Sequence, residues 1–318
     1  MSLFYPIQSN GQTMLYQPIR EKYSILMEDD KVRIGASSMQ GWRNSMEDAH
    51  TIHLSLPNIP SVDPEDGALV AVFDGHCGCK TAHFAATHIL EWISSTKAFV
   101  EGDMWRAIHD AFLSGDAAMQ KVSPFERSGC TGNCVVLLQN HIYCGNVGDS
   151  RAVMCRGGVA IPLSEDHKPT LPKERERITK AGCYVRNGRV NGMLSLSRAL
   201  GDFDFKFGNL SPEEQAVSAN PDVIHMELTP QDEFVIIACD GVWEKVSNEQ
   251  AVEFVRKEVD EHSDLSLACE RLMDFCLAPV ANAPGTDNMT VIIIEFKSLL
   301  LKKVEDGFDK TFTTLIDK

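Results

Sequence analysis

The 318-residue sequence lacks several features that would each point to a particular class of protein. No run approaches 18 apolar residues, so we expect no membrane-spanning helix. Positive charge is in deficit, with 30 Lys and Arg against 45 Asp and Glu, which gives a net charge of −15. Nucleic acids and anionic membranes are themselves polyanions, so we expect neither as a partner.

A disulfide framework is also not expected, although the chain has ten cysteines. Cys134, Cys144 and Cys239 lie inside apolar runs, as small buried hydrophobic residues do. The stretch MSLFYPIQSNGQTMLYQ is interrupted by polar residues and does not resemble a secretory signal. We therefore expect free thiols and an intracellular protein of the cytoplasm, the nucleus or both.

No linker or repeat divides the chain between about residues 33 and 297, which favours one main domain over residues 31–298. We expect a loosely structured lead-in over residues 1–30, with one strand around Tyr16, and a short tail over 299–318 that could form a helix. Between residues 166 and 221 the sequence is charged and rich in turns. Long irregular segments inside compact domains are usually functional, so we predict a flap there rather than a plain surface loop.

Hydrophobic periodicity predicts both strands and helices. Short β-branched runs predict buried strands at residues 69–73, 134–138, 142–146, 234–238 and 291–296. Amphipathic spacing predicts helices at residues 81–94, 104–122, 173–180, 248–259 and 265–277. The pair Gln139-Asn140 separates two predicted strands and indicates an antiparallel hairpin. Clustered strands, with helices early and late in the chain, predict sheets covered by helices on both sides.

Carboxylates stand next to apolar runs in four places. Glu47 and Asp48 close the segment RNSMED, Asp74 and Asp240 each end an apolar run at Asp-Gly, and Asp287 precedes the run at 290–294. Several partly desolvated aspartates can converge only if cations compensate their charge. Oxygen ligands without a histidine cluster select Mg²⁺ or Mn²⁺, and two such ions can activate water and clamp a phosphoryl group.

Each of these signals has an ordinary structural explanation when taken alone. An Asp-Gly pair marks a turn, and Arg43 by itself would be a salt-bridge partner. Cys77 and Cys79 beside His76 could suggest zinc, but no second cysteine pair stands at ligand spacing. The combination of signals is what favours a metal centre.

Nine co-linear stretches resemble the metal-dependent protein phosphatase 2C family (PPM type). They are residues 41–50 (GWRNSMEDAH), 72–76 (VFDGH), 127–131 (RSGCT), 146–151 (NVGDSR), 165–169 (EDHKP), 189–192 (RVNG), 195–202 (SLSRALGD), 238–243 (ACDGVW) and 285–291 (GTDNMTV). The resemblance implies an α+β fold, a four-layer α-β-β-α sandwich of two mainly antiparallel sheets. It also implies that residues 31–298 are the catalytic domain of a protein serine/threonine phosphatase.

The resemblance further implies two Mn²⁺ or Mg²⁺ ions and assigns their ligands. The position of Asp74 bridges both metals in the family. Asp240 and Asp287 match the residues that complete one site. Glu47, largely through water, and the backbone carbonyl of Gly75 match the ligands of the other. A hydroxide between the two ions would attack the phosphorus in-line, with no covalent enzyme intermediate.

Four more residues receive roles from the same resemblance. Asp48 matches a further acidic position near the metals. Arg43 matches the arginine that binds the substrate phosphate, and His76 the histidine proposed to protonate the leaving oxygen. Asn288 is expected to orient ligands or waters around the site.

A weak third metal site is implied at Asp149 and at position 244. Position 244 is Glu here where many members have Asp, and the extra methylene moves the carboxylate outward. We therefore expect weaker binding of a third ion.

Two other functions are weighed against this one. A pseudophosphatase scaffold would have no physical need to keep Glu47, Asp74, Asp240 and Asp287 together. An enzyme acting on small phosphoesters or nucleotides is not excluded by the ligands, although no basic patch supports it. The expected partners are phosphoserine and phosphothreonine proteins, and a monomer is favoured while the oligomeric state stays open.

Overall fold

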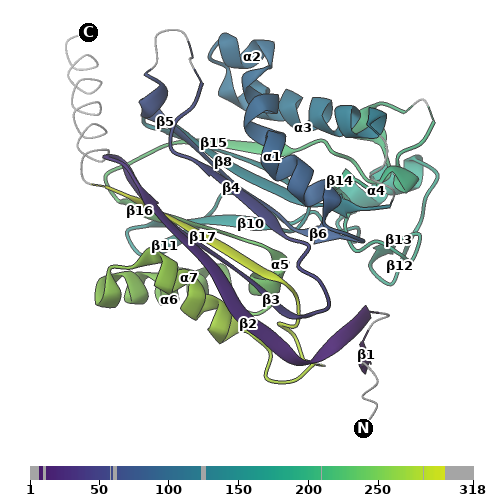
Figure 1. The fold of residues 1–318 in the computed structure, drawn as a ribbon. Helices are drawn as coiled ribbons and strands as arrows, with labels where there is room; N and C mark the ends of the chain where they lie inside the picture. Colours follow the sequence, from purple (N-terminus) through teal and green to yellow (C-terminus); the bar gives the residue numbers. More distant parts are fainter. Residues whose placement is uncertain are drawn as a thin grey trace.

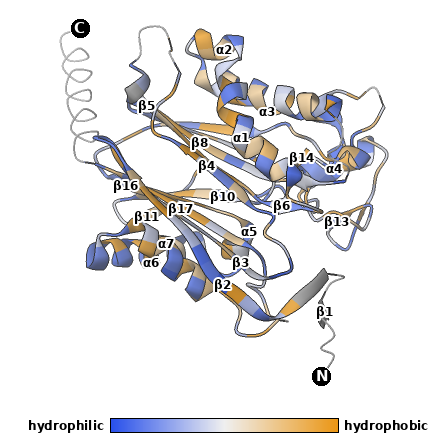
Figure 2. Cartoon of the chain, in the orientation of Figure 1, coloured by the Kyte–Doolittle hydropathy of each residue, from blue (hydrophilic) through white to orange (hydrophobic). Residues whose placement is uncertain are grey.

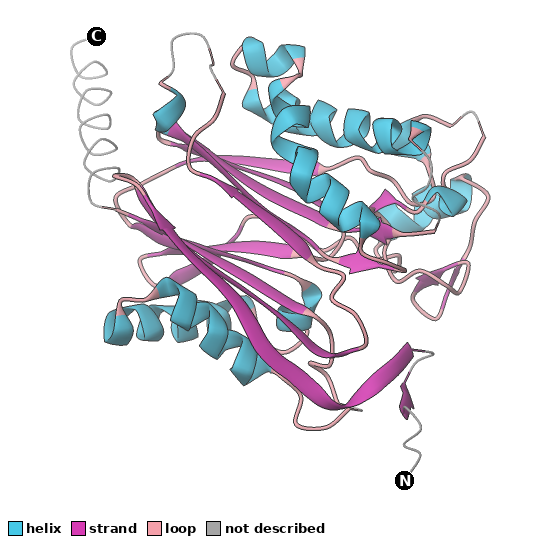
Figure 3. Ribbon diagram, viewed as in Figure 1, coloured by secondary structure: helices cyan, strands magenta, loops and turns pink. Residues whose placement is uncertain are grey.

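The structure is a computed structural model that describes residues 7–9, 12–57, 59, 63–122, 127–208, 210–281 and 283–297. Two β-sheets lie face to face, and helices cover the outer face of each, so the chain forms four layers (Figures 1 and 3). The strands of both sheets pair antiparallel throughout. The predicted α-β-β-α sandwich is confirmed.

The larger sheet has seven strands in the order β1-β2-β3-β17-β16-β10-β11. Their bounds are β1 Ile7–Ser9, β2 Gln12–Glu28, β3 Val32–Arg43, β17 Met289–Phe296, β16 Asp232–Ala238, β10 Arg151–Arg156 and β11 Val159–Pro162. Helices α6 (Asn248–His262) and α7 (Leu265–Cys276) cover its outer face (Figure 1). The short helix α5 (Asp240–Trp243) follows β16 directly.

The smaller main sheet has five strands in the order β15-β9-β8-β5-β4. Their bounds are β15 Asp222–Glu227, β9 His141–Val147, β8 Gly132–Leu138, β5 Gly67–Phe73 and β4 Ala49–His53. Helices α1 (Lys80–Ser94), α2 (Lys97–Val100) and α3 (Met104–Lys121) lie over it (Figure 1). A small sheet beside it consists of β14 (Leu200–Gly201), β7 (Gly129–Cys130) and β6 (Gly75–His76).

Side-chain alternation along the strands explains the layers. In β5, Leu69 and Phe73 pack under the helices, whereas Val70 and Val72 pack in the core between the sheets. Because successive side chains of a strand point to opposite faces, a strand with apolar residues at every position is buried on both. Figure 2 shows strands of the two sheets with many apolar residues, and helices in which apolar and polar residues alternate along the chain.

The predicted inner elements are confirmed. The strands expected at 69–73, 134–138, 142–146, 234–238 and 291–296 lie within β5, β8, β9, β16 and β17. The five predicted helices correspond to α1, α3, α4 (Pro172–Lys180), α6 and α7, with ends that agree to within a few residues. The helix expected after Leu299 lies outside the described residues.

The stretch expected as a loosely structured lead-in differs from the prediction. A strand was expected around Tyr16, but β2 runs over 17 residues and pairs with β3. The sequence of β2 shows no clear period of two, because the strand lies near the edge of the sheet. Tyr23 and Leu26 point to opposite faces, and both are exposed. A strand that is exposed to solvent on both faces does not need the alternation of apolar and polar residues by which strands are predicted.

The described residues of the segment 166–221, which are all but residue 209, include an apolar cluster of their own. Ile178 of α4 packs with Val190 and Ala216, and the hairpin β12 (Val185–Arg186) and β13 (Arg189–Val190) lies beside it. Glu174 anchors α4 through ion pairs of 2.7 Å with Arg177 and Arg198. None of the described helices is long and apolar enough to cross a bilayer.

Candidate metal centre

The predicted site residues converge at one end of the sandwich from both sheets. Asp74 follows β5 of the five-stranded sheet, whereas Asp240 follows β16 of the seven-stranded sheet. An open pocket of about 660 Å³ lies there. Among the residues lining it are the predicted Arg43, Asp74, Gly75, His76, Asp149, Asp240, Glu244 and Asp287.

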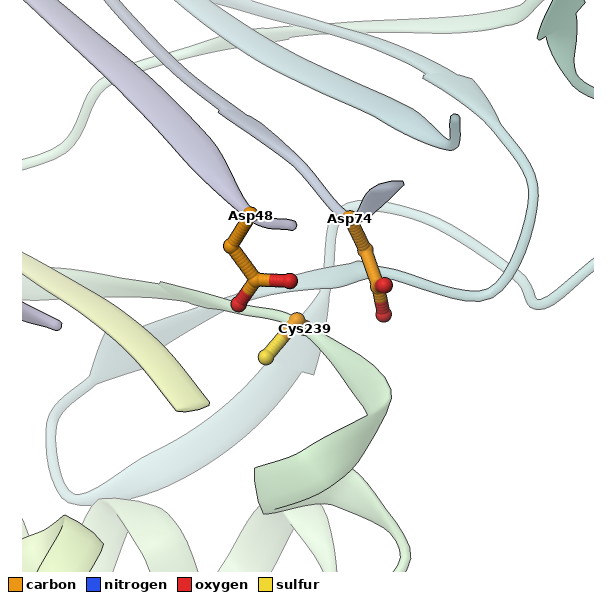
Figure 4. A group of neighbouring side chains, drawn as sticks. All are labelled: Asp48, Asp74 and Cys239. Atoms are coloured by element: carbon orange, nitrogen blue, oxygen red, sulfur yellow. The ribbon is translucent and has the colours of Figure 1, made fainter. Parts of the chain in front are cut away.

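The carboxylates are close enough to share ions. One carboxylate oxygen each of Asp74, Asp149 and Asp240 lies within 4.8 Å of the others. Asp48, Asp74 and the thiol of Cys239 form a second group under the same limit (Figure 4). Asp48 is 5% exposed and lies below the pocket rather than on its wall.

Burial and mutual repulsion make these carboxyl groups hard to ionise. Burial raises the pKa of Asp48 to about 7, and the charge of Asp287 adds to the rise. The pKa values of Asp74 and Asp240 lie well above the usual range, first because of burial and then because of neighbouring aspartates. A group of acids in this state requires protons or cations to be stable at neutral pH.

The donor set fits hard divalent cations. Oxygen dominates it, as Mg²⁺ and Mn²⁺ require. The one sulfur, Cys239, is already engaged, because its Sγ accepts from the backbone N–H of Thr290 at 3.2 Å and its pKa is raised far above the normal range by burial. Within the part of the chain that the structure describes, Asp48 Oδ1 is buried without a hydrogen-bond partner. An unsatisfied buried oxygen beside other carboxylates is what a cation or its water would satisfy.

Arg43, the last residue of β3, presents a guanidinium to the same pocket. Its Nη2 donates a hydrogen bond to Asp287 Oδ2. Its Nε is buried and, among the described residues, has no acceptor. An arginine fork with an unused donor suits an anion with several oxygens.

Glu47 and Asn288 fasten the loop between β3 and β4 to the site. Asn288 Oδ1 accepts from the Glu47 backbone N–H at 2.9 Å, and its Nδ2 donates to the carbonyl groups of Gln40 and Ser45. The Glu47 carboxylate accepts from the backbone N–H of Gly78. A Cβ at Gly75 would lie 2.2 Å from the Glu47 carbonyl oxygen, so only glycine permits this approach.

His76 is held by Asp202, a residue to which the sequence pattern gives no role. Its Nε2 and Asp202 Oδ2 are 2.7 Å apart. Burial lowers the pKa of His76, but the charge of Asp202 and this hydrogen bond outweigh burial and raise it. A Cβ at Gly129 would lie 2.2 Å from Asp202 Oδ2 and 2.5 Å from His76 Nε2, so the pair fits only against glycine.

Lys168 is the other site residue without a predicted role, and its Nζ donates to Asp149 Oδ2. Burial lowers the pKa of Lys168, but Asp149 and nearby carboxylates raise it overall, so the lysine stays charged. Glu244 lines the pocket but is exposed, and it belongs to neither close group of potential ligands. Both missed residues lie in motifs already noted, EDHKP and SLSRALGD, but their partners are distant in the sequence.

The chain is similar in sequence to one protein family and its curated members, and similar in fold to solved structures. A family model described as "Protein phosphatase 2C" matches residues 32–283. Protein phosphatase 2C homolog 2 of Hypocrea jecorina is 46% identical, over 94% of this chain and 70% of the relative. Protein phosphatase 2C homolog 3 of Schizosaccharomyces pombe is 44% identical, over 93% and 73%. A phosphatase structure from Toxoplasma gondii has a TM-score of 0.74 at 29% identity, and the match covers 87% of this chain and 96% of that one.

Proposed function

The chain belongs to the protein phosphatase 2C family of metal-dependent serine/threonine protein phosphatases, and we propose that water attacks the substrate phosphorus directly, without a covalent enzyme intermediate. The observation that carries this proposal is the convergence of Asp74, Asp149 and Asp240 within 4.8 Å, a group of carboxylates suited to hold ions that activate water. Substrates are phosphoserine and phosphothreonine proteins.

Two divalent ions, Mn²⁺ or Mg²⁺, are held by Asp74, Asp240 and Asp287 and by Glu47 with the Gly75 carbonyl. Bound there, such ions supply charge neutralisation and a lowered pKa of water. The raised pKa values of Asp74, Asp240 and Asp287 support this assignment, because carboxyl groups that are hard to ionise alone are stabilised by a cation. Asp48, beneath the pocket, adds negative charge to the site through Oδ1, which has no hydrogen-bond partner among the described residues.

Arg43 orients the phosphate. Its guanidinium lies in the pocket and is bound to Asp287 through Nη2, whereas its Nε is buried and has no acceptor among the described residues. Placing two or three N–H groups on the non-bridging oxygens stabilises the charge that builds up there. Asn288 acts indirectly, since its three hydrogen bonds fix the loop that carries Glu47.

His76 protonates the leaving serine or threonine oxygen. Asp202 occupies Nε2, which leaves Nδ1 as the nitrogen that can transfer a proton to the substrate. The raised pKa of His76 keeps the imidazole protonated closer to neutral pH.

The remaining assignments concern the edges of the site. Asp149 and Glu244 form a weak third cation site, where the ammonium of Lys168 already neutralises Asp149. Residues 166–221 act as a flap that contacts the substrate protein, because Met193 and Leu194 line one wall of the pocket. The catalytic domain spans residues 31–298.

Hydrolysis of p-nitrophenyl phosphate tests the proposal directly. Purified protein is assayed with Mn²⁺, with Mg²⁺ and with EDTA, alongside Asp74→Asn. Activity that needs metal and is lost in Asp74→Asn supports the assignment. No activity with either metal, together with no metal binding by calorimetry, would instead favour a scaffold. Faster turnover of small metabolite phosphates than of phosphopeptides would contradict the proposed substrate class.

A further inference from the structure

Two histidines meet on the outer face of the five-stranded sheet, away from the pocket. In the pairing of β9 with β15, His141 lies opposite Glu227, and Tyr143 lies opposite His225. The four residues are two apart on each strand, so their side chains share one face. His141 is the first residue of β9 and the pocket residue Asp149 lies just past its other end, and the six steps from His141 to Val147 span roughly 20 Å.

The two imidazoles are spaced as metal ligands are. His141 Nδ1 and His225 Nε2 are 3.1 Å apart. Two nitrogens each about 2.05 Å from one ion lie roughly 3.3 Å apart at a tetrahedral angle and roughly 2.9 Å apart at a right angle. We propose that His141 and His225 bind one transition-metal ion such as Zn²⁺, at a site separate from the carboxylate centre.

The surroundings of the pair favour this role. The ring of Tyr143 stacks on His225 with centroids 4.4 Å apart and planes 5° from parallel, which fixes the orientation of that imidazole. Burial and the neighbouring His225 lower the pKa of His141, so the neutral ring that a metal requires is favoured. His225 is exposed, so an ion can enter from solvent.

The chemistry of the site differs from that of the pocket. Imidazole nitrogen suits zinc, copper and nickel, whereas carboxylate oxygen suits magnesium and manganese. Among the described residues, no carboxylate or thiol forms a close group of three with the two imidazoles, and the carboxylate of Glu227, opposite His141, accepts from Asn140 Nδ2 at 2.8 Å. Water completes the coordination. A simple hydrogen bond between the rings is the competing explanation of the same distance.

Calorimetric titration with Zn²⁺ separates these explanations. The full chain is first saturated with Mg²⁺, so that the carboxylate centre is occupied by an ion that imidazoles bind poorly. Wild type is compared with His141→Gln and His225→Gln, and with His83→Gln as a matched control, because His83 is exposed on α1 and distant in the fold. Thermal melting without zinc verifies that each variant is folded.

We expect wild type and His83→Gln to bind one more equivalent of Zn²⁺ than either His141→Gln or His225→Gln. Addition of Cu²⁺ should broaden the amide NMR signals of β9 and β15 in wild type and His83→Gln but not in His141→Gln or His225→Gln. The same zinc stoichiometry and affinity in all four proteins would overturn the proposal, as would the absence of any zinc-specific binding in wild type. Zinc bound at the exposed thiol of Cys77 or the partly exposed thiol of Cys79 would be common to all four proteins and would not mimic the expected difference.

Discussion

Replacing Glu174 by Gln should loosen the flap by a calculable amount. The Glu174 side chain is 3% exposed and lies between two arginines, with Arg177 Nη1 and Arg198 Nη2 each 2.7 Å from its oxygens. Burial raises the pKa of Glu174, but the hydrogen bonds and charges of the two arginines outweigh burial and lower this pKa from 4.5 to about 2. That difference corresponds to about 3 kcal/mol in favour of the ionised, folded form. Breaking a buried ion pair costs a similar ~3–5 kcal/mol.

The effect has a defined pH dependence. The folded-state pKa of Glu174 is below the unfolded one, so its contribution is complete above roughly pH 5 and is lost as pH falls through about 2. Denaturant unfolding of wild type and Glu174→Gln should therefore differ by about 3 kcal/mol at pH 7 and by less than half as much at pH 3.

Glu176→Gln is the matched control, on the same helix but with an exposed side chain paired to an exposed lysine. It should leave the unfolding curve unchanged. The reasoning would be refuted if the two variants behaved alike, or if the difference caused by Glu174→Gln stayed constant from pH 6 to pH 3.

Three further changes test the catalytic centre. Gly129→Ala places a methyl group 2.2 Å from Asp202 Oδ2, so kcat should fall at least about tenfold while Mn²⁺ affinity by calorimetry is unchanged; a normal kcat would contradict the packing argument. Asp202→Asn removes the charge that raises the pKa of His76, so the alkaline limb of the kcat profile should move to lower pH, and an unmoved limb would show that His76 is not the acid. Glu244→Asp should tighten the weak third cation site beside Asp149, seen as a lower dissociation constant in metal titration; equal weak-site affinities would refute the role of the extra methylene.

The sequence predicts the inner fold because buried strands carry their own signature. The apolar runs of β5 and β16 are continuous, and each is followed closely by an aspartate. Packing of the apolar core gives no reason for a carboxylate at these positions. The abrupt change from apolar residues to a carboxylate is enough to single out Asp74 and Asp240 in the sequence alone. The strand β2, next to the edge of its sheet, was not predicted in full for the opposite reason, because exposed residues on both of its faces remove the alternation of polar and apolar residues.

Pairwise contacts within the site could not be read from the chain. His76 and Asp202 are 126 residues apart, and Asp149 and Lys168 are 19 apart across a turn-rich segment. Composition and periodicity carry no information about such pairs, which depend on the packing of whole elements. The backbone requirement at Gly129 is equally invisible, since only the approach of two side chains makes a Cβ intolerable there.

The proposed metal ligands come from two different sheets, and this has a mechanical consequence. Asp74 is attached to one layer and Asp240 to the other, so the spacing between them is set by the apolar side chains wedged between the layers, Val72 and Ile237 among them. The packing of these side chains therefore determines the distance between the carboxylates of the two aspartates. A substitution that thins this packing, far from any reacting atom, would weaken metal affinity before it unfolds the protein. Conversely, ions bound by both aspartates would link the two sheets at this end of the sandwich. Loss of the ions would then lower both the activity and the stability of the protein.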